Sequence, residues 1–276
     1  MAFLPSVNRP PAQPDPPAAP HSESPRRPTV LGLHGRQWMV VAVVVGCCYL
    51  AMTFAALAGA WTTLHREPTA AEMKRAAAAE VARRWQTWPA QRIFPERLPY
   101  TTGGGHSEYA SLQGISSATA CDTTAADAEI SAVLRRHGCR AVLRATYADQ
   151  LQGVVVTVGV VAFADPFQAD RALRELPAAT LPDRSRGVRP ALRAAAFPGT
   201  AAARFTDAAR QDRSSDRGGP YVVLTTSGQA DGRPAAAITK NRPGNPFALA
   251  PQLGRRIAKT LSTQALPDCS SREWRC

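Results

Sequence analysis

The sequence predicts an α+β fold, in which a single transmembrane helix is followed by a stalk helix and one extracytoplasmic domain of antiparallel strands packed by helices. Three observations carry this prediction. Residues 39–60 form a long run without a charged side chain. Residues 139–148 and 154–163 have the apolar patterns of β-strands, and the flanking segments place apolar side chains at helical spacing. Because the two strands are close in sequence, a hairpin and an antiparallel sheet are expected.

The composition excludes several classes of protein. The 24 prolines among 276 residues follow no glycine-every-third pattern, so collagen is excluded. An apolar share of 45% is too high for a wholly disordered chain, and six cysteines are too few for a small disulfide scaffold. The length suggests one or two domains.

The net charge of +12 comes from 33 basic and 21 acidic residues. Nearly all of the excess is arginine, and the arginines are scattered among acidic residues rather than clustered with aromatic ones. Clustered basic stripes are typical of nucleic-acid-binding proteins. The pattern therefore predicts a solvated basic surface and no nucleic-acid partner, although such a surface could hold anionic envelope polymers or lipid headgroups loosely.

The transmembrane helix is expected over residues 38–61. The uncharged run would form a helix of roughly 33 Å, against about 30 Å of hydrocarbon in a bilayer. Trp38 and Trp61 bracket the run and are the candidate membrane-interface anchors. Residues 58–60 resemble a signal-peptidase site, so cleavage is the alternative. The run is longer than a usual signal peptide and follows a long tail, which favours an uncleaved signal anchor.

Equal numbers of basic residues lie near the two ends of the helix, so the charge rule gives no orientation. The orientation is instead predicted from the parts of the chain on either side. Residues 1–35 are rich in proline and are expected to form a disordered cytoplasmic tail. The larger carboxy-terminal part contains four cysteines, and disulfides form in oxidising compartments. We therefore expect a single-pass protein of the cell membrane, with its amino terminus cytoplasmic and its carboxy-terminal domain extracellular.

Small residues recur every fourth position within the span, at Ala51, Ala55 and Gly59. A stripe of this kind lets a second helix approach closely, so a homodimer is one hypothesis and chance in an alanine-rich segment is the other. Cys47 and Cys48 lie deep in the span and are expected to be small packing residues.

The stalk helix is expected over residues 68–89, where Thr69 and Glu72 have the spacing of a capping box. The extracytoplasmic domain should then occupy residues 90–264, and residues 265–276 should be a loosely held tail with cysteines. The expected elements of the domain are an extended piece at 98–101, a glycine loop at 102–106, a helix at 125–137, strands at 139–148 and 154–163, a helix from 165, a basic loop at 181–187, a strand at 201–208, a polar loop tip at 211–219, strands at 220–226 and 235–239 joined by a turn at 231–232, and a helix at 247–261.

Four exported cysteines, Cys121, Cys139, Cys269 and Cys276, are the disulfide candidates and allow three pairings. Cys269 with Cys276 would close a short loop. Cys121 with Cys139 is natural by spacing, but the helix expected between them would be about 20 Å long, whereas bridged alpha carbons lie within about 7 Å. That bridge requires residues 121–124 to fold back along the helix, or the helix to be shorter. Cross-pairing with the tail stays open.

The search for catalytic chemistry is negative. The sequence has no nucleophile elbow, no zinc-protease helix, no Walker loop and no paired metal-ligand spacing. His106 and His137 are expected to be structural or solvated, and so are the carboxylates of Glu96 and Glu108. No catalytic residue, cofactor or metal is predicted.

Three segments, TWPAQRIFPERLPYTT, CRAVLRATYADQLQGVVVTVGVVAFAD and GPYVVLTTSGQADGRP, carry a resemblance to a group of actinobacterial single-pass membrane proteins. The resemblance covers about residues 71–234. It implies a membrane location and this architecture, and it carries over no catalytic residues.

The function that this organisation favours is a membrane-anchored extracytoplasmic binding or accessory domain of the cell envelope, with an envelope protein as its partner. Two alternatives remain. One is a cell-envelope hydrolase with an unfamiliar site. The other is a single-pass sensor that signals through the proline-rich tail.

Overall fold

The computed structural model describes residues 35–66, 69–178, 180–183, 187–234 and 246–265. The chain divides into two compact units, Met1–Glu67 and Pro68–Cys276. The predictions of a disordered tail, of a strand at 235–239 and of a loose carboxy-terminal tail lie almost entirely outside the described residues.

The first unit contains one long helix, α1 (Gly35–His65). Its segment Gly35–Thr63 is long and apolar enough to cross a membrane and contains the predicted span.

The second unit is built on a six-stranded sheet in the order β1-β2-β3-β4-β8-β7, and every neighbouring pair is antiparallel. The α+β class and the antiparallel arrangement are thereby confirmed. Two further strands form a separate small ladder. The elements are α2 (Ala70–Thr87), α3 (Ala90–Ile93), β1 (Arg97–Thr101), β2 (Ser107–Ile115), α4 (Ala128–Arg136), β3 (Ala141–Ala148), β4 (Val154–Ala162), α5 (Pro166–Arg174), β5 (Thr180–Asp183), β6 (Gly187–Arg189), the 3-10 helix η1 (Asp207–Ala209), β7 (Asp212–Gly218), β8 (Tyr221–Gln229) and α6 (Leu249–Ser262).

The centre of the sheet is the β3–β4 hairpin that the sequence predicts. The hairpin pairs Ala141 with Ala162 at one end and Ala148 with Val155 at the other. Both faces of β4 are buried, as its continuous apolar run predicts. In the sequence, Arg144 and Thr146 alternate with apolar residues and predict one polar face on β3. This prediction is wrong, because helices cover both sides of the sheet and both residues are buried.

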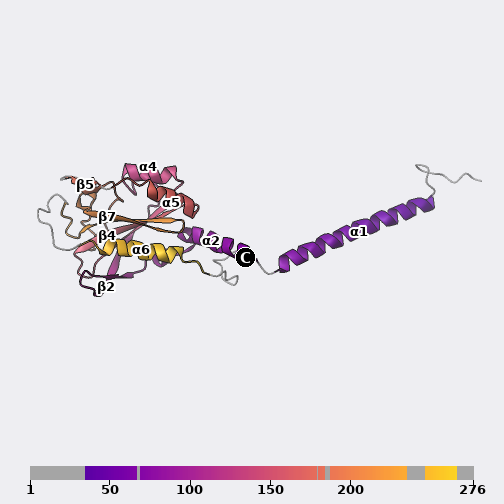
Figure 1. The fold of residues 1–276 in the computed structure, drawn as a ribbon, viewed down its shortest axis with the longest axis horizontal. Coiled ribbons are helices and arrows are strands. Elements are labelled where there is room, and N and C mark those ends of the chain that lie inside the picture. The colour runs from indigo at the N-terminus through magenta and orange to yellow at the C-terminus, as the bar shows by residue number, and fades with distance from the viewer. Residues whose placement is uncertain (1–34, 67–68, 179, 184–186, 235–245, 266–276) are drawn as a thin grey trace, which may run out of the picture. The chain divides into compact units, whose positions relative to one another are not determined.

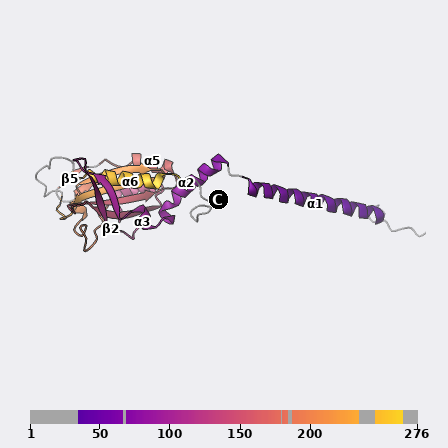
Figure 2. The same cartoon turned by 90° about the horizontal axis from the view of Figure 1, so that it is seen from below.

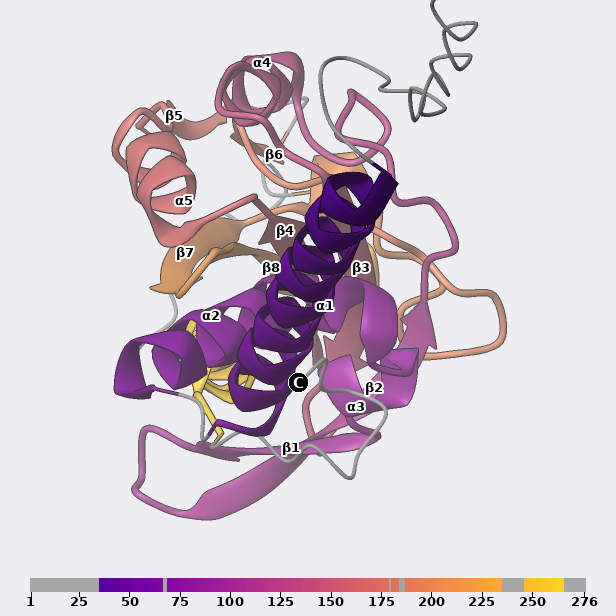
Figure 3. The same cartoon turned by 90° about the vertical axis from the view of Figure 1, so that its right-hand side faces the viewer.

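Helices cover the two faces of the sheet (Figures 1 and 3). α6 packs in one core with Tyr147, Val158 and Tyr221, and α4 and α5 pack in another with Val142 and Val161. The sheet curls so that its β1 edge also contacts α6 (Figure 2). There, Gln252 accepts a hydrogen bond from the Thr101 amide and donates one to the Thr101 carbonyl oxygen, each of 2.8 Å.

α2 begins with the predicted capping box: Thr69 Oγ1 accepts from the Glu72 amide at 3.3 Å, and the Glu72 carboxylate accepts from the Thr69 amide at 2.8 Å. The end of the helix is part of the packed unit. Arg84 pairs with Glu80 at 2.6 Å and donates to the carbonyl oxygens of Leu261 and Thr263 at the end of α6. The helix predicted as a stalk is therefore docked on the domain along its second half.

Other expectations are corrected by long-range pairing. The loop tip expected at 211–219 is strand β7. It is polar in sequence, lies at the edge of the sheet and pairs with β8. The strand expected at 201–208 is a series of turns ending in η1. The glycine loop at 102–106 is the turn of a hairpin whose second strand, β2, was not predicted. The basic loop at 181–187 contributes residues at both ends to the β5–β6 ladder.

Candidate functional site

The first candidate feature is the apolar surface of α1. Trp38 and Trp61 lie near its two ends, and both are exposed together with the large apolar side chains between them. Trp61 stacks on His65, with ring centroids 4.0 Å apart. Large exposed apolar surfaces mark contacts with a membrane or a partner. The stripe of Ala51, Ala55 and Gly59 is exposed as well, and the homodimer stays a prediction.

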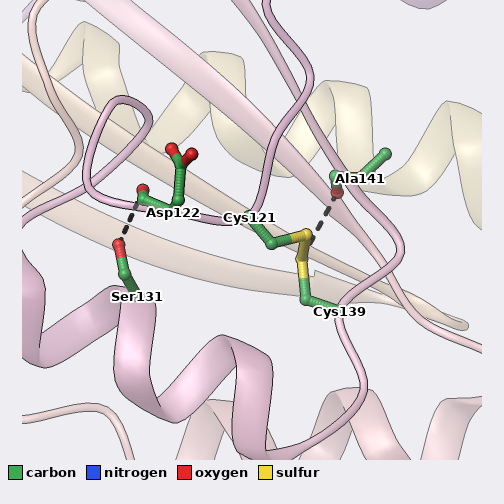
Figure 4. The surroundings of a disulfide bond; sticks show 5 residues. All are labelled: Cys121, Asp122, Ser131, Cys139 and Ala141. Atoms are coloured by element: carbon green, nitrogen blue, oxygen red, sulfur yellow. Dashed lines mark hydrogen bonds between the residues drawn. A yellow bond between two sulfur atoms is a disulfide. The ribbon is translucent and has the colours of Figure 1, made fainter.

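The second feature is a disulfide bond between Cys121 and Cys139, whose alpha carbons are 6.2 Å apart (Figure 4). The structure resolves the geometric objection in both of the expected ways. α4 spans only nine residues instead of the predicted thirteen, and the segment 121–127 folds back beside it. Ser131 of α4 holds this segment by donating to the carbonyl oxygen of Asp122 at 2.8 Å. Cys269 and Cys276 lie outside the described residues.

The far end of the same segment is held by a buried carboxylate. Asp127 is completely buried and accepts a hydrogen bond from the Ala191 amide at 3.0 Å. The guanidinium of Arg210, itself only 1% exposed, lies 3.1 Å from the carboxylate, and those of Arg189 and Arg193 lie 3.5 Å away. A buried charge is tolerated when it is paired and hydrogen-bonded in this way. The cluster therefore has a structural role, which is to fix the segment 189–193 against the start of α4.

The third feature is a cavity of about 340 Å³ on the α4 and α5 side of the sheet. Its apolar lining comes from α4, α5, β8 and the two connecting segments that follow α5 and β6. The polar lining comes from β7 and from its neighbour β8. The lining residues are Ile130, Leu173, Leu176, Pro177, Ala178, Ala191, Leu192, Arg213, Ser214, Ser215, Leu224 and Thr225.

Arg213 carries the only charge in this lining. It donates from Nη1 to the carbonyl oxygen of Pro190, and from Nη2 to that of Pro177 at 2.5 Å. Burial lowers the pKa of the Arg213 guanidinium, because the charged form loses solvation. Sequence reasoning missed this residue, since it placed residues 211–219 in a solvated loop.

The structure disperses the titratable residues that the sequence singled out. His137 pairs with Glu175 at 2.8 Å, and the hydrogen bond from the imidazole lowers the pKa of the Glu175 carboxyl. Glu108 accepts a hydrogen bond from the Tyr100 hydroxyl; burial and this bond raise the pKa of Tyr100 to about 12. His106 lies exposed in the β1–β2 turn. Within the described ranges, no three metal-ligating side chains gather at one place.

Comparisons with known proteins give no match: no protein-family model fits the chain, and neither curated proteins nor solved structures resemble it significantly.

Proposed function

We propose that the protein is a membrane-anchored extracytoplasmic domain that binds a component of the cell envelope, with an envelope protein as its partner. The observation that carries the proposal is the Cys121–Cys139 disulfide in a chain that also contains an exposed apolar helix of membrane-spanning length. Disulfides persist on the oxidising side of a membrane and are rare in the reducing cytosol. The resemblance to actinobacterial single-pass membrane proteins agrees with this placement.

A binding role is supported by the difference between the buried charged residues, which stabilise the fold, and the residues that line the cavity. The buried charges at Glu80, Arg84, Asp127 and Arg210 pair with one another and with backbone groups, so they stabilise the domain. The cavity beside β7 combines aliphatic side chains with the hydroxyl groups of Ser214, Ser215 and Thr225 and one cationic side chain, and a few convergent polar groups of this kind can orient a ligand. The envelope-hydrolase alternative would need a general base beside a nucleophile in such a cavity. Ser214, Ser215 and Thr225 supply hydroxyl groups, but the lining contains no carboxylate and no histidine to activate them.

The proposal is tested by counting free thiols in the full chain, isolated from its native membrane under alkylating conditions. In a Cys269→Ser/Cys276→Ser background, a maleimide–polyethylene glycol reagent should modify only Cys47 and Cys48 in the denatured, unreduced chain. After reduction it should modify all four remaining cysteines.

The matched control adds Cys121→Ser to the same background. This chain should show the same number of modified thiols before and after reduction, because Cys139 has then lost its partner. If the starting background already shows all four thiols before reduction, the disulfide is absent in the cell and the proposal is wrong.

A further inference from the structure

We propose that the cavity beside β7 binds a small aliphatic carboxylate, with the hydrocarbon body against the apolar lining and the carboxylate on Arg213. This inference rests on the proposed function in one respect, namely that the domain binds a ligand rather than catalysing a reaction. It requires no particular orientation of the domain across the membrane.

The apolar part of the cavity is formed by aliphatic side chains from α4, α5, β8 and the segments that follow α5 and β6. Ile130 of α4, Leu224 of β8 and Leu192, which follows β6, are each less than 5% exposed and form the inner wall. The other aliphatic residues are Leu173 of α5 and Leu176, which follows α5, and both are partly exposed. A volume of about 340 Å³ is within the range of small-molecule pockets. The aliphatic side chains offer water no hydrogen-bond partner, so a short hydrocarbon chain in contact with them would replace that water favourably.

The polar part of the cavity holds a cation without a protein counter-ion. Arg213 has five N–H donors, and two of its nitrogens are bonded to the carbonyl oxygens of Pro177 and Pro190. These bonds fix the guanidinium at the cavity wall and leave three donors without an acceptor in the described part of the chain. No described carboxylate forms an ion pair with Arg213, whereas Arg217 on the same strand lies 3.7 Å from Asp170.

The arrangement of the remaining N–H donors of Arg213 favours a carboxylate as the polar end of the ligand. A guanidinium presents pairs of N–H groups that match the two oxygens of a carboxylate, and the charge-assisted bonds are stronger than neutral ones. Because the site is partly desolvated, an anion there interacts with Arg213 more strongly than it would in water. An alcohol or an amine of the same length offers no negative charge and should bind worse.

The test uses the full chain in nanodiscs of zwitterionic lipid, with hexanoate as the probe and the methyl NMR signals of Ile130 and Leu192 as the readout. Hexanoate should shift both signals in a saturable manner, and 1-hexanol and hexylamine should bind more weakly. Arg213→Met should weaken hexanoate binding by about tenfold or more, because bonds to a charged partner are lost. Arg217→Met, the matched control, should leave binding unchanged.

A second variant is needed because Arg213 also donates hydrogen bonds to two carbonyl groups, so that its replacement could disturb the fold. Leu176→Phe should fill the space next to the partly exposed Leu176 and weaken hexanoate binding while Arg213 remains. The proposal is overturned if hexanoate produces no saturable shift in the wild-type chain, if hexanol binds as tightly as hexanoate, or if both variants bind like the wild type. Failure here leaves the thiol count unaffected, so the two proposals fail separately.

Discussion

Two apolar regions of the chain, β4 and α1, differ in burial. β4 is a run of valines, alanine, glycine and one threonine whose side chains are buried on both faces of the sheet. α1 is also rich in valine and alanine, yet its large apolar side chains are exposed. The difference lies in geometry. A strand of nine residues can be enclosed by neighbouring strands and helices, whereas the 29-residue apolar segment of α1 is long enough to cross a bilayer and is not enclosed by the rest of the described chain.

The largest expected effect comes from placing the same charge in each run. Val158→Asp buries a carboxylate without a partner in the core, and we expect it to cost more than about 4 kcal/mol and to unfold the domain. Val44→Asp should leave the domain folded and instead impair membrane insertion by about 3 kcal/mol. The stability of the domain is measured by urea unfolding, with tryptophan fluorescence as the signal. Membrane insertion is measured by the fraction of the chain that carbonate extracts from membranes. If Val44→Asp unfolded the domain, the two runs would not be independent.

The next effect concerns the docking of α2. Arg84→Met removes the cation from a buried pair with Glu80 and leaves carbonyl groups at the end of α6 without a donor. Breaking a buried pair costs about 3–5 kcal/mol. The measurement is again the free energy of unfolding in urea. Arg75→Met, at an exposed position of the same helix, should change it by less than about 0.5 kcal/mol. Equal effects of the two substitutions would show that α2 is not docked.

Removal of the disulfide should have a slightly smaller effect. The bond joins residues separated by 18 positions, and closing a loop of this size stabilises a fold by about 3 kcal/mol. The double variant Cys121→Ser/Cys139→Ser should lose about that much stability, whereas Cys47→Ser/Cys48→Ser should lose none from the domain. Thermal unfolding of the full chain in nanodiscs compares them. A double variant as stable as the wild type would mean that the hydrogen bonds of Ser131 and Asp127 hold the segment 121–127 without the disulfide.

The smallest effect is expected at the start of α2. Thr69→Ala removes the side-chain oxygen that caps the Glu72 amide and should destabilise the first turn by about 1 kcal/mol. Amide hydrogen exchange over residues 70–73 would report this as faster exchange. Thr87→Ala at the other end of the helix makes no such cap and is the control. Unchanged exchange in Thr69→Ala would show that the capping box contributes nothing.

Local signals allowed part of this fold to be predicted. β4 is marked by a dense valine run, and β3 and β8 by shorter stretches of apolar and β-branched residues. α5 is marked by Asp165, whose carboxylate accepts from the Gln168 amide at 2.9 Å as a cap should. Each of these signals lies within a few residues of the element that it marks. Residue pattern alone was enough there.

The missed features depend on partners far away in sequence. β7 has the polar sequence DRSSDRG and becomes a strand because β8 pairs with it; Ser214 and Thr225 share a 2.6 Å hydrogen bond across the two strands. Asp127 meets Arg210 from 83 residues away. The cavity and the position of Arg213 follow from the same long-range packing, so no local pattern could indicate them.

The most direct test of the account is the side of the membrane on which the domain lies. The background for this test replaces Cys47, Cys48, Cys269 and Cys276 with Ser and keeps the disulfide. One reporter is Leu151→Cys, at a fully exposed position in the β3–β4 turn, and the other is Ser6→Cys in the amino-terminal tail. A membrane-impermeant maleimide added to intact cells should label Leu151→Cys at once and Ser6→Cys only after permeabilisation. Labelling in the reverse order would place the domain in the cytoplasm and contradict the account.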